Sequence, residues 1–279
     1  MSLYSIAKGK SDLDDIIFFV ADQINKGVND SWDQSSPNLR LDLIDINEMA
    51  GVKAFNSSDY SSASSYLGSA MSLLPDDHCE CHYERSLRIS FLLSKSAYSC
   101  GDVEKARSIS QEKMKRCRCI KDKLSFHLLL GTIQQDRGEV SATYNTCREV
   151  LSQLGEAVPQ SMSPKQTSEM IRSTLSMVKG ISDSHLLAMR ECDEKTRNCL
   201  KFYTLMTSVA HNAKPEMFPF ICCRMIQLTM SGQICTYSIS GTCWCVFDNF
   251  VTNQSSFVSL FLYCFTAHRT NRICCHDMQ

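Results

Sequence analysis

The segment Leu41–Pro75 constrains the fold most strongly, because it predicts two short helices that fold back on each other. Apolar side chains recur at steps of three and four residues, first before a polar breaker at 56–59 and again after it. The second stripe ends at Pro75, which cannot continue a helix. The expected buried faces are Leu43, Ile46, Ala50 and Ala54, then Tyr60, Ala63, Tyr66, Leu67, Ala70, Leu73 and Leu74.

Small residues mark the place where the two helices would cross. Gly51 is followed by Ala63 twelve positions on, Ala70 seven further and Pro75 five further. A glycine or alanine at a crossing lets two backbones approach, whereas a larger side chain would hold them apart. This spacing resembles that of the tetratricopeptide repeat, a helical hairpin that stacks on its neighbours.

Two further segments, His82–Met114 and Asp122–Leu154, repeat this pattern. Each has a glycine turn, a close-contact position before the turn and a small residue twelve positions later. Because one hairpin cannot bury its own apolar face, successive hairpins are expected to stack. We therefore predict an all-α fold, a tetratricopeptide-like right-handed superhelix of antiparallel helix pairs. The marker residues are Ser94, Gly101-Asp102 and Ala106 in the second copy, and Gly131, Gly138-Glu139 and Thr143 in the third.

Helices are also predicted on both sides of the repeats. An amphipathic helix at 12–29 is expected to bury Ile16, Phe19, Val20, Ile24 and Val28, and a linker at 30–38 follows it. After a break at 155–164, we expect helices at 165–179, 196–211 and 215–230. The predicted divisions are an N-terminal helix and linker at 1–38, the repeats at 39–155, further helical hairpins at 156–240, and an atypical tail at 241–279.

The tail differs in composition from the rest of the chain. It has four Asp or Arg residues, no Lys or Glu, and five of the sixteen cysteines, and it shows no helical stripe. An exposed segment this apolar would promote aggregation. We expect an irregular C-terminal tail that either packs on the end of the superhelix or arises from a gene assignment that reads past a true exon boundary.

Composition excludes several classes of function. The chain has 29 Lys and Arg against 30 Asp and Glu, so no large basic surface for nucleic acid is expected. Its start lacks the apolar core of a signal peptide, and its cysteines are therefore expected to be mostly reduced in a cytoplasmic protein. The longest apolar candidate, Phe257–Ala267, is too short for a membrane span.

The chain contains, in order, the phrases DIIFFVADQINKG, RLDLIDINEMAGVKAFNSSDYSSASSYLGSAMSLLP, AYSCGDVEKA, DKLSFHLLLGTIQQDRGEVSATYNTCREVLSQLGEAVP and KPEMFPFICCRMIQLTMSGQICTYS. Over roughly residues 15–240 it resembles the helical middle region of large AAA-type signalling ATPases. The resemblance implies a preceding nucleotide-binding domain, often after a serine/threonine-kinase-like head, with sensor, histidine-kinase or cyclase modules following. The ATP-binding motifs of that family are not matched, so it supplies no catalytic residue.

Two clusters suggest ligand chemistry but lack the spacing that it needs. Gly9-Lys10-Ser11 reproduces the end of a phosphate-binding loop, yet the glycine required five positions earlier is replaced by Tyr4. His78-Cys79-Glu80-Cys81-His82 offers ligands that suit zinc, yet five adjacent residues cannot readily surround one tetrahedral ion. Cys117 and Cys119 would complete that site only if folding brought them near. We expect a polar N-terminus and an ordinary loop between repeats.

Three other groups each have a structural and a functional interpretation. Cys222-Cys223 and Cys274-Cys275 are adjacent pairs that rarely bridge each other, and nothing ties His127 or His211 to a cysteine as a catalytic base. The basic run Lys113–Arg118 is expected to be a solvated last helical turn, with docking of an acidic peptide as the alternative. A helix core is favoured over a ligand pocket for Met217, Phe218, Phe220, Met225, Ile226 and Met230.

The sequence therefore predicts a non-catalytic scaffold or regulatory region with no catalytic, cofactor-binding or metal-binding residues. Its expected partner is a protein, a peptide or an adjacent ATPase or kinase module. Binding to nucleic acid or to a membrane is not expected. The alternatives are an autonomous thiol- or zinc-dependent enzyme, and a degenerate fragment without function.

Overall fold

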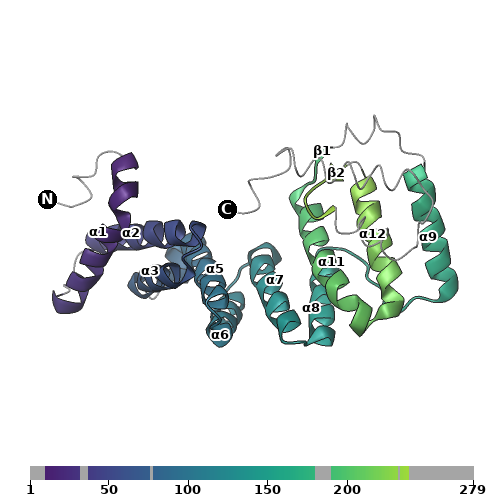
Figure 1. Cartoon of the computed structure of the whole chain (residues 1–279), viewed down its shortest axis with the longest axis horizontal. Coiled ribbons are helices and arrows are strands. Elements are labelled where there is room, and N and C mark those ends of the chain that lie inside the picture. The colour runs from purple at the N-terminus through teal and green to yellow at the C-terminus, as the bar shows by residue number, and fades with distance from the viewer. Residues whose placement is uncertain (1–9, 32–36, 76–77, 180–189, 232, 239–279) are drawn as a thin grey trace. The chain divides into compact units, whose positions relative to one another are not determined.

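The structure, a computed structural model, describes residues 10–31, 37–75, 78–179, 190–231 and 233–238 (Figure 1). The described residues are helical apart from their connections and two strands of two residues each. The prediction of an all-α fold is thus confirmed. The expected tail at 241–279 lies outside the described residues.

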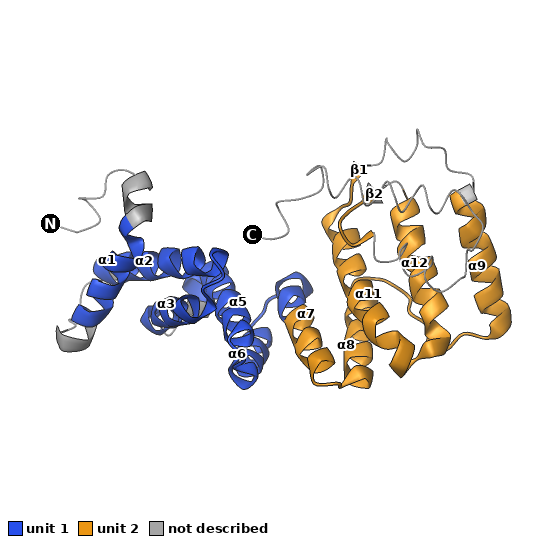
Figure 2. Ribbon diagram, viewed as in Figure 1, with its two compact units in different colours: residues 1–126 blue, residues 127–279 orange. Residues whose placement is uncertain are grey.

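The chain divides into two compact units, residues 1–126 and 127–279 (Figure 2). The division falls within α7 (Ile120–Asp136). The boundaries expected at residues 38, 155 and 240 follow composition and repeat length, and they stay predictions. Each unit is described by itself below.

Unit 1 contains two helical hairpins that pack in chain order. The first joins α2 (Pro37–Asn56) to α3 (Tyr60–Leu73), and the second joins α5 (Tyr83–Ser99) to α6 (Val103–Lys115). α3 packs on α5, so the second hairpin lies against the first. Ala54, Ala63 and Leu67 lie in the fully buried core between them. A single helical turn, α4 (His78–Cys81), precedes α5.

The turns of the three predicted hairpins have the same backbone geometry. Ser58, Gly101 and Gly138 occupy matching positions, and their φ angles are 62°, 84° and 72°. Only glycine adopts this left-handed conformation without steric cost. The next residue begins the return helix, and Asp59 and Asp102 cap it by accepting a hydrogen bond from the backbone N–H three positions on.

α1 (Lys10–Ser31) buries only part of the face expected: Val20 and Ile24 pack on the core, and the side chain of Val28 lies outside the described residues. Ile16 and Phe19 are 47% and 67% exposed, whereas Ile17 and Ala21 are fully buried against α2. The apolar run IIFFV gives almost the same periodicity on two neighbouring faces. Contacts with the neighbouring helix α3 determine which face is buried. Phe18 stacks on Tyr66 of α3, whose hydroxyl donates to Asp22 Oδ1 at 2.7 Å.

The helices of unit 2 do not stack in chain order. α8 (Val140–Gln153) packs on α11 (Glu194–Ala213), α11 packs on α12 (Phe218–Met230), and α12 packs on α9 (Pro164–Lys179). α9 therefore lies beyond α12 instead of beside α8 (Figure 1). Among the described helices of this unit, a chain-order array of hairpins does not continue past α8.

Short irregular elements complete unit 2. A 3-10 turn at Pro215–Met217 leads into α12, so the helix expected from Pro215 begins three residues later. β1 (Arg190–Glu191) pairs in parallel with β2 (Gln233–Ile234) at one end of α11 and α12 (Figure 1). Two-residue strands carry too few residues to show the alternation by which strands are found in a sequence.

Candidate functional site

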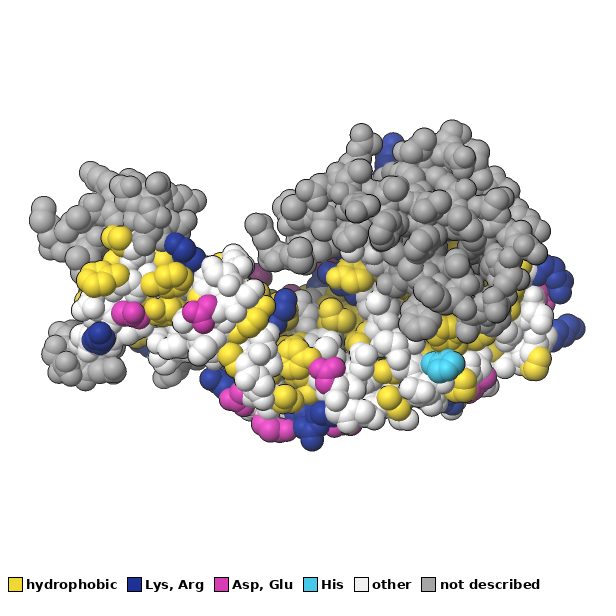
Figure 3. Space-filling view, viewed as in Figure 1, with side chains coloured by type: hydrophobic (Ala, Val, Ile, Leu, Met, Phe, Trp, Pro, Cys, Tyr) yellow, Lys and Arg dark blue, Asp and Glu magenta, His cyan; other side chains and the backbone are white. Residues whose placement is uncertain are grey.

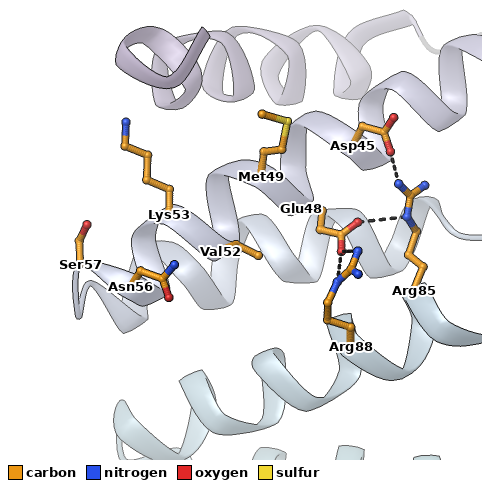
Figure 4. A pocket seen from close by; sticks show the side chains of 9 residues that line it. All are labelled: Asp45, Glu48, Met49, Val52, Lys53, Asn56, Ser57, Arg85 and Arg88. Carbon is orange, nitrogen blue, oxygen red and sulfur yellow. Dashed lines mark hydrogen bonds and ion pairs between the residues drawn. The ribbon is translucent and has the colours of Figure 1, made fainter. Parts of the chain in front are cut away.

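A groove of about 750 Å³ lies along the first helices of the two hairpins in unit 1 (Figure 4). α2 contributes most of its lining and α5 contributes two arginines. In stacked hairpins the first helices of successive pairs lie side by side, which is why these side chains meet. The lining residues are Asp45, Glu48, Met49, Val52, Lys53, Asn56, Ser57, Arg85 and Arg88.

An ion-pair cluster closes one end of the groove. Arg85 pairs with Asp45, and its Nε lies 3.0 Å from Glu48 Oε2. Arg88 Nε donates to Glu48 Oε1 at 2.7 Å. The Glu48 side chain is only 7% exposed, so both arginines satisfy a carboxylate that is nearly removed from water (Figure 4).

The charge that the groove presents to solvent is mainly positive. The Arg88 side chain is 59% exposed although it pairs with Glu48. Lys53 points away from the ion pairs (Figure 4), with its Nζ 5.4 Å from the centre of the Phe18 ring. On α5, Lys95 Nζ lies 5.2 Å from the centre of the Phe55 ring. Half-buried Met49 and Val52 add apolar surface between these cations.

These groove residues were not predicted from the sequence, although a signal for them exists. Asp45, Glu48 and Val52 follow one another at three- and four-residue steps on the side of α2 away from its core. Arg85 and Arg88 are likewise three residues apart on the corresponding helix of the next hairpin. Comparing the polar faces of the two first helices, and not only their apolar faces, would have identified the groove.

The basic run Lys113–Arg118 matches the expected solvated helical turn only in part, because Lys115, Arg116 and Arg118 are exposed but Lys113 is buried. Lys113 is 5% exposed, and its Nζ donates to the hydroxyl of Ser86. Arg118 stacks over the Tyr83 ring, 4.0 Å from its centre. Arg116 pairs with Glu112 at 3.3 Å. Internal contacts thus occupy much of the run, which weakens the alternative of acidic-peptide docking there.

The segment expected to resemble a zinc site lies in and beside α4. Arg118 Nη2 donates to the carbonyl of Glu80 at 3.3 Å, so folding does bring the segment holding Cys117 and Cys119 close to it. The described residues nevertheless contain no group of three His, Cys, Asp or Glu side chains able to share a metal. The side chains of His78 and Cys79 lie outside the described residues.

Tyr83 organises the contact beside that segment instead. Its hydroxyl donates to Asp122 Oδ2 and accepts a hydrogen bond from the Arg118 N–H at 2.9 Å. Burial and the neighbouring Asp122 carboxylate raise the pKa of Tyr83 to about 12. The phenol therefore remains protonated and fixes the start of α7 against α5.

The remaining candidate residues from the sequence either lie within helices or fall outside the described residues. Lys10 and Ser11 begin α1, while Gly9 and the Cys274-Cys275 pair are not described. Cys222 and Cys223 are buried in α12. The helix-core interpretation of the methionine and aromatic set is confirmed, since all six side chains are at most 8% exposed.

A second buried charge cluster joins three parts of unit 2. Glu156, which follows α8, accepts hydrogen bonds from Arg224 Nε at 2.7 Å, Arg224 Nη2 at 3.0 Å and the Tyr203 hydroxyl at 3.0 Å. Burial raises the pKa of the Glu156 carboxyl, but Arg224 outweighs it and holds the pKa below its ordinary value of 4.5. Each partner belongs to a different helix, so the cluster fixes the packing of α11 and α12.

Comparison with known proteins assigns no family to this chain. No family model, no curated protein and no solved structure matches the chain. Among the described residues, no helix is long and apolar enough to cross a membrane. On the face seen in Figure 3, charged side chains of both signs alternate with apolar ones in the described part of the chain.

Proposed function

We propose that this chain is a non-catalytic helical-repeat scaffold whose groove on α2 and α5 binds an extended, acidic segment of a partner protein. The groove itself carries the proposal. It runs along two helices and offers apolar surface from Met49 and Val52 together with the exposed guanidinium of Arg88. Extended peptides bind in such sites through side-chain pockets and charge pairs.

Charge complementarity favours an acidic occupant. Asp45 and Glu48 already pair with Arg85, and Glu48 is almost completely buried. The Asp45 side chain is 34% exposed but its charge is paired, and Arg88, at 59%, is the most exposed member of the ion-pair cluster. Opposite charges at such a rim raise the association rate and select the partner, and their effect weakens with salt.

The wider assembly follows from the sequence resemblance. We propose that the hairpins belong to a tetratricopeptide-like superhelix and that the bound segment comes from an adjacent ATPase or kinase module. Hairpin packing in chain order within unit 1 supports the first part. The second part rests on the resemblance alone.

The groove is tested by selecting peptides from a random displayed library on the wild-type chain and measuring their affinity by fluorescence anisotropy. The selected peptides should be rich in Asp and Glu. Arg88→Glu should weaken their binding by about tenfold or more. The matched control is Lys115→Glu, which makes the same charge change at an exposed position of α6 outside the groove.

Arg88→Ala serves as a second variant, because Arg88→Glu places a new carboxylate beside Glu48. It should weaken binding in the same direction without that repulsion. Equal affinity of the selected peptides for the Arg88 variants and for Lys115→Glu would overturn the proposal.

A further inference from the structure

Cys192 and Cys235 lie directly after the two short strands of unit 2. β1 and β2 pair in parallel, with Glu191 opposite Ile234, and the Cys192 N–H donates to the Ile234 carbonyl at 3.0 Å. The next position along both strands therefore sets Cys192 beside Cys235. Neighbouring strands lie about 4.8 Å apart, and a disulfide needs a Cα separation of roughly 4.4–6.8 Å.

The two thiols already interact. Each thiol perturbs the pKa of the other, and the Ser238 hydroxyl lies 3.8 Å from the Cys235 sulfur. Ser238 also accepts a hydrogen bond from the Cys235 N–H at 3.1 Å, which fixes the turn that carries the thiol. The adjacent Cys192 thiol outweighs burial and lowers the pKa of the Cys235 thiol.

We propose that Cys192 and Cys235 form a redox pair, which a hydroperoxide converts into a reversible disulfide between the ends of β1 and β2. The proposal concerns unit 2 alone and does not depend on peptide binding by the groove in unit 1. Cys235, whose sulfur lies beside the Ser238 hydroxyl, is the attacking thiolate, and Cys192 is the resolving thiol.

The chemistry balances in two steps. The Cys235 thiolate attacks one peroxide oxygen, the O–O bond breaks, and the departing oxygen takes a proton, which leaves a sulfenic acid on Cys235. The Cys192 sulfur then attacks the Cys235 sulfur, the S–O bond breaks, and the departing hydroxide takes the Cys192 proton as water. The two thiols are oxidised and the peroxide is reduced. A dithiol reverses the bond by thiol–disulfide exchange.

Access to the pair requires only local opening. Both cysteines are at most 4% exposed, but they lie at the end of a ladder with two residues per strand. Such a short ladder has few backbone hydrogen bonds and opens without unfolding the helices. Exposed residues adjoin it, since the Glu191 side chain is 60% exposed.

The disulfide would restrain the hairpin between the two cysteines. Cys192 precedes α11 and Cys235 follows α12, so the bond would close a loop that contains both helices. Closing a loop of this length removes conformational freedom from the unfolded chain. Oxidation should therefore raise the melting temperature of unit 2 by roughly 10 °C.

The full chain is treated with hydrogen peroxide, the remaining thiols are alkylated under denaturing conditions, and peptides are mapped by mass spectrometry. We expect a peptide that links Cys192 to Cys235 and disappears after dithiothreitol treatment. Cys199 is the internal control, because burial raises the pKa of that thiol to about 11 and it should stay alkylatable. Alkylation of both Cys192 and Cys235, or a linkage of either to another cysteine, would overturn the proposal.

Cys192→Ser separates the two steps. In this variant dimedone should trap a sulfenic acid on Cys235, and oxidation should no longer shift the melting temperature. The mapping of the wild-type chain needs no variant and decides the proposal even if the substitution prevents folding. An unchanged melting temperature of the linked wild-type chain would contradict the predicted restraint.

Discussion

Gly51 leaves no room for a side chain at the crossing of α2 and α3. A Cβ built there would lie 2.6 Å from Leu67 Cγ and 3.3 Å from the Leu67 backbone nitrogen. Leu67 is fully buried and cannot move aside without disturbing the core around it. The same helix pair contains Gly68 on α3, where a Cβ would meet nothing within 4 Å.

These two glycines predict opposite effects of the same substitution. Gly51→Ala should lower the free energy of unfolding by about 1–3 kcal/mol, because it overpacks the crossing. Gly68→Ala should raise it by about 0.5–1 kcal/mol, because alanine restricts the unfolded chain and favours the helix. Urea denaturation measures both. A Gly51→Ala variant as stable as Gly68→Ala would show that the crossing is not closely packed.

The Glu156–Arg224 pair predicts a dependence of stability on pH. The folded pKa of Glu156 lies below its value in the unfolded chain. Its contribution is therefore complete above the ordinary value of 4.5 and is lost as the pH falls through the folded pKa. Glu156→Gln should cost about 2 kcal/mol at pH 7, since Arg224 is then left partly buried without its carboxylate.

The variant should also lose this part of the acid sensitivity. We expect the difference in unfolding free energy between Glu156→Gln and the wild type to shrink as the pH is lowered from 7 to 3, measured by urea denaturation of unit 2. A difference that stays constant over this range would mean that Glu156 does not carry the charge assigned to it.

At the scale of elements, the turns of the hairpins were well predicted by sequence because their chemistry is local. Gly101-Asp102 and Gly138-Glu139 supply a residue suited to positive φ and a residue that begins the next helix. The helices on either side end within a few residues of the expected positions. The buried face of α1 was predicted only in part, since its contacts with Tyr66 of α3 are not encoded in its own periodicity.

The shared turn geometry predicts reciprocal effects of glycine. Ser58→Gly should stabilise the first hairpin by about 0.5–1 kcal/mol, because it removes a non-glycine residue from the left-handed region. Gly101→Ala should destabilise the second by about 1 kcal/mol, and the added Cβ meets nothing within 4 Å, so only the backbone is tested. Denaturation curves that shift both variants in the same direction would contradict a common turn.

At the scale of the whole molecule, repeats predict neighbours only while helices follow one another regularly. That holds from α2 to α6, where each hairpin packs on the next. It fails after α8. α8 packs on α11 and α11 on α12, and α9, which precedes both in the sequence, packs on α12 instead of on α8. The groove on α2 and α5 was also missed, since it depends on polar residues that come together only when two hairpins are stacked.

The most direct test of peptide binding in the groove is hydrogen–deuterium exchange of the wild-type chain with and without a peptide selected on it. Binding in the groove should slow amide exchange in residues 45–57 of α2 and its turn and in residues 83–95 of α5, and leave α11 and α12 unchanged. Slower exchange confined to unit 2, or no change in either groove segment, would contradict the proposed site.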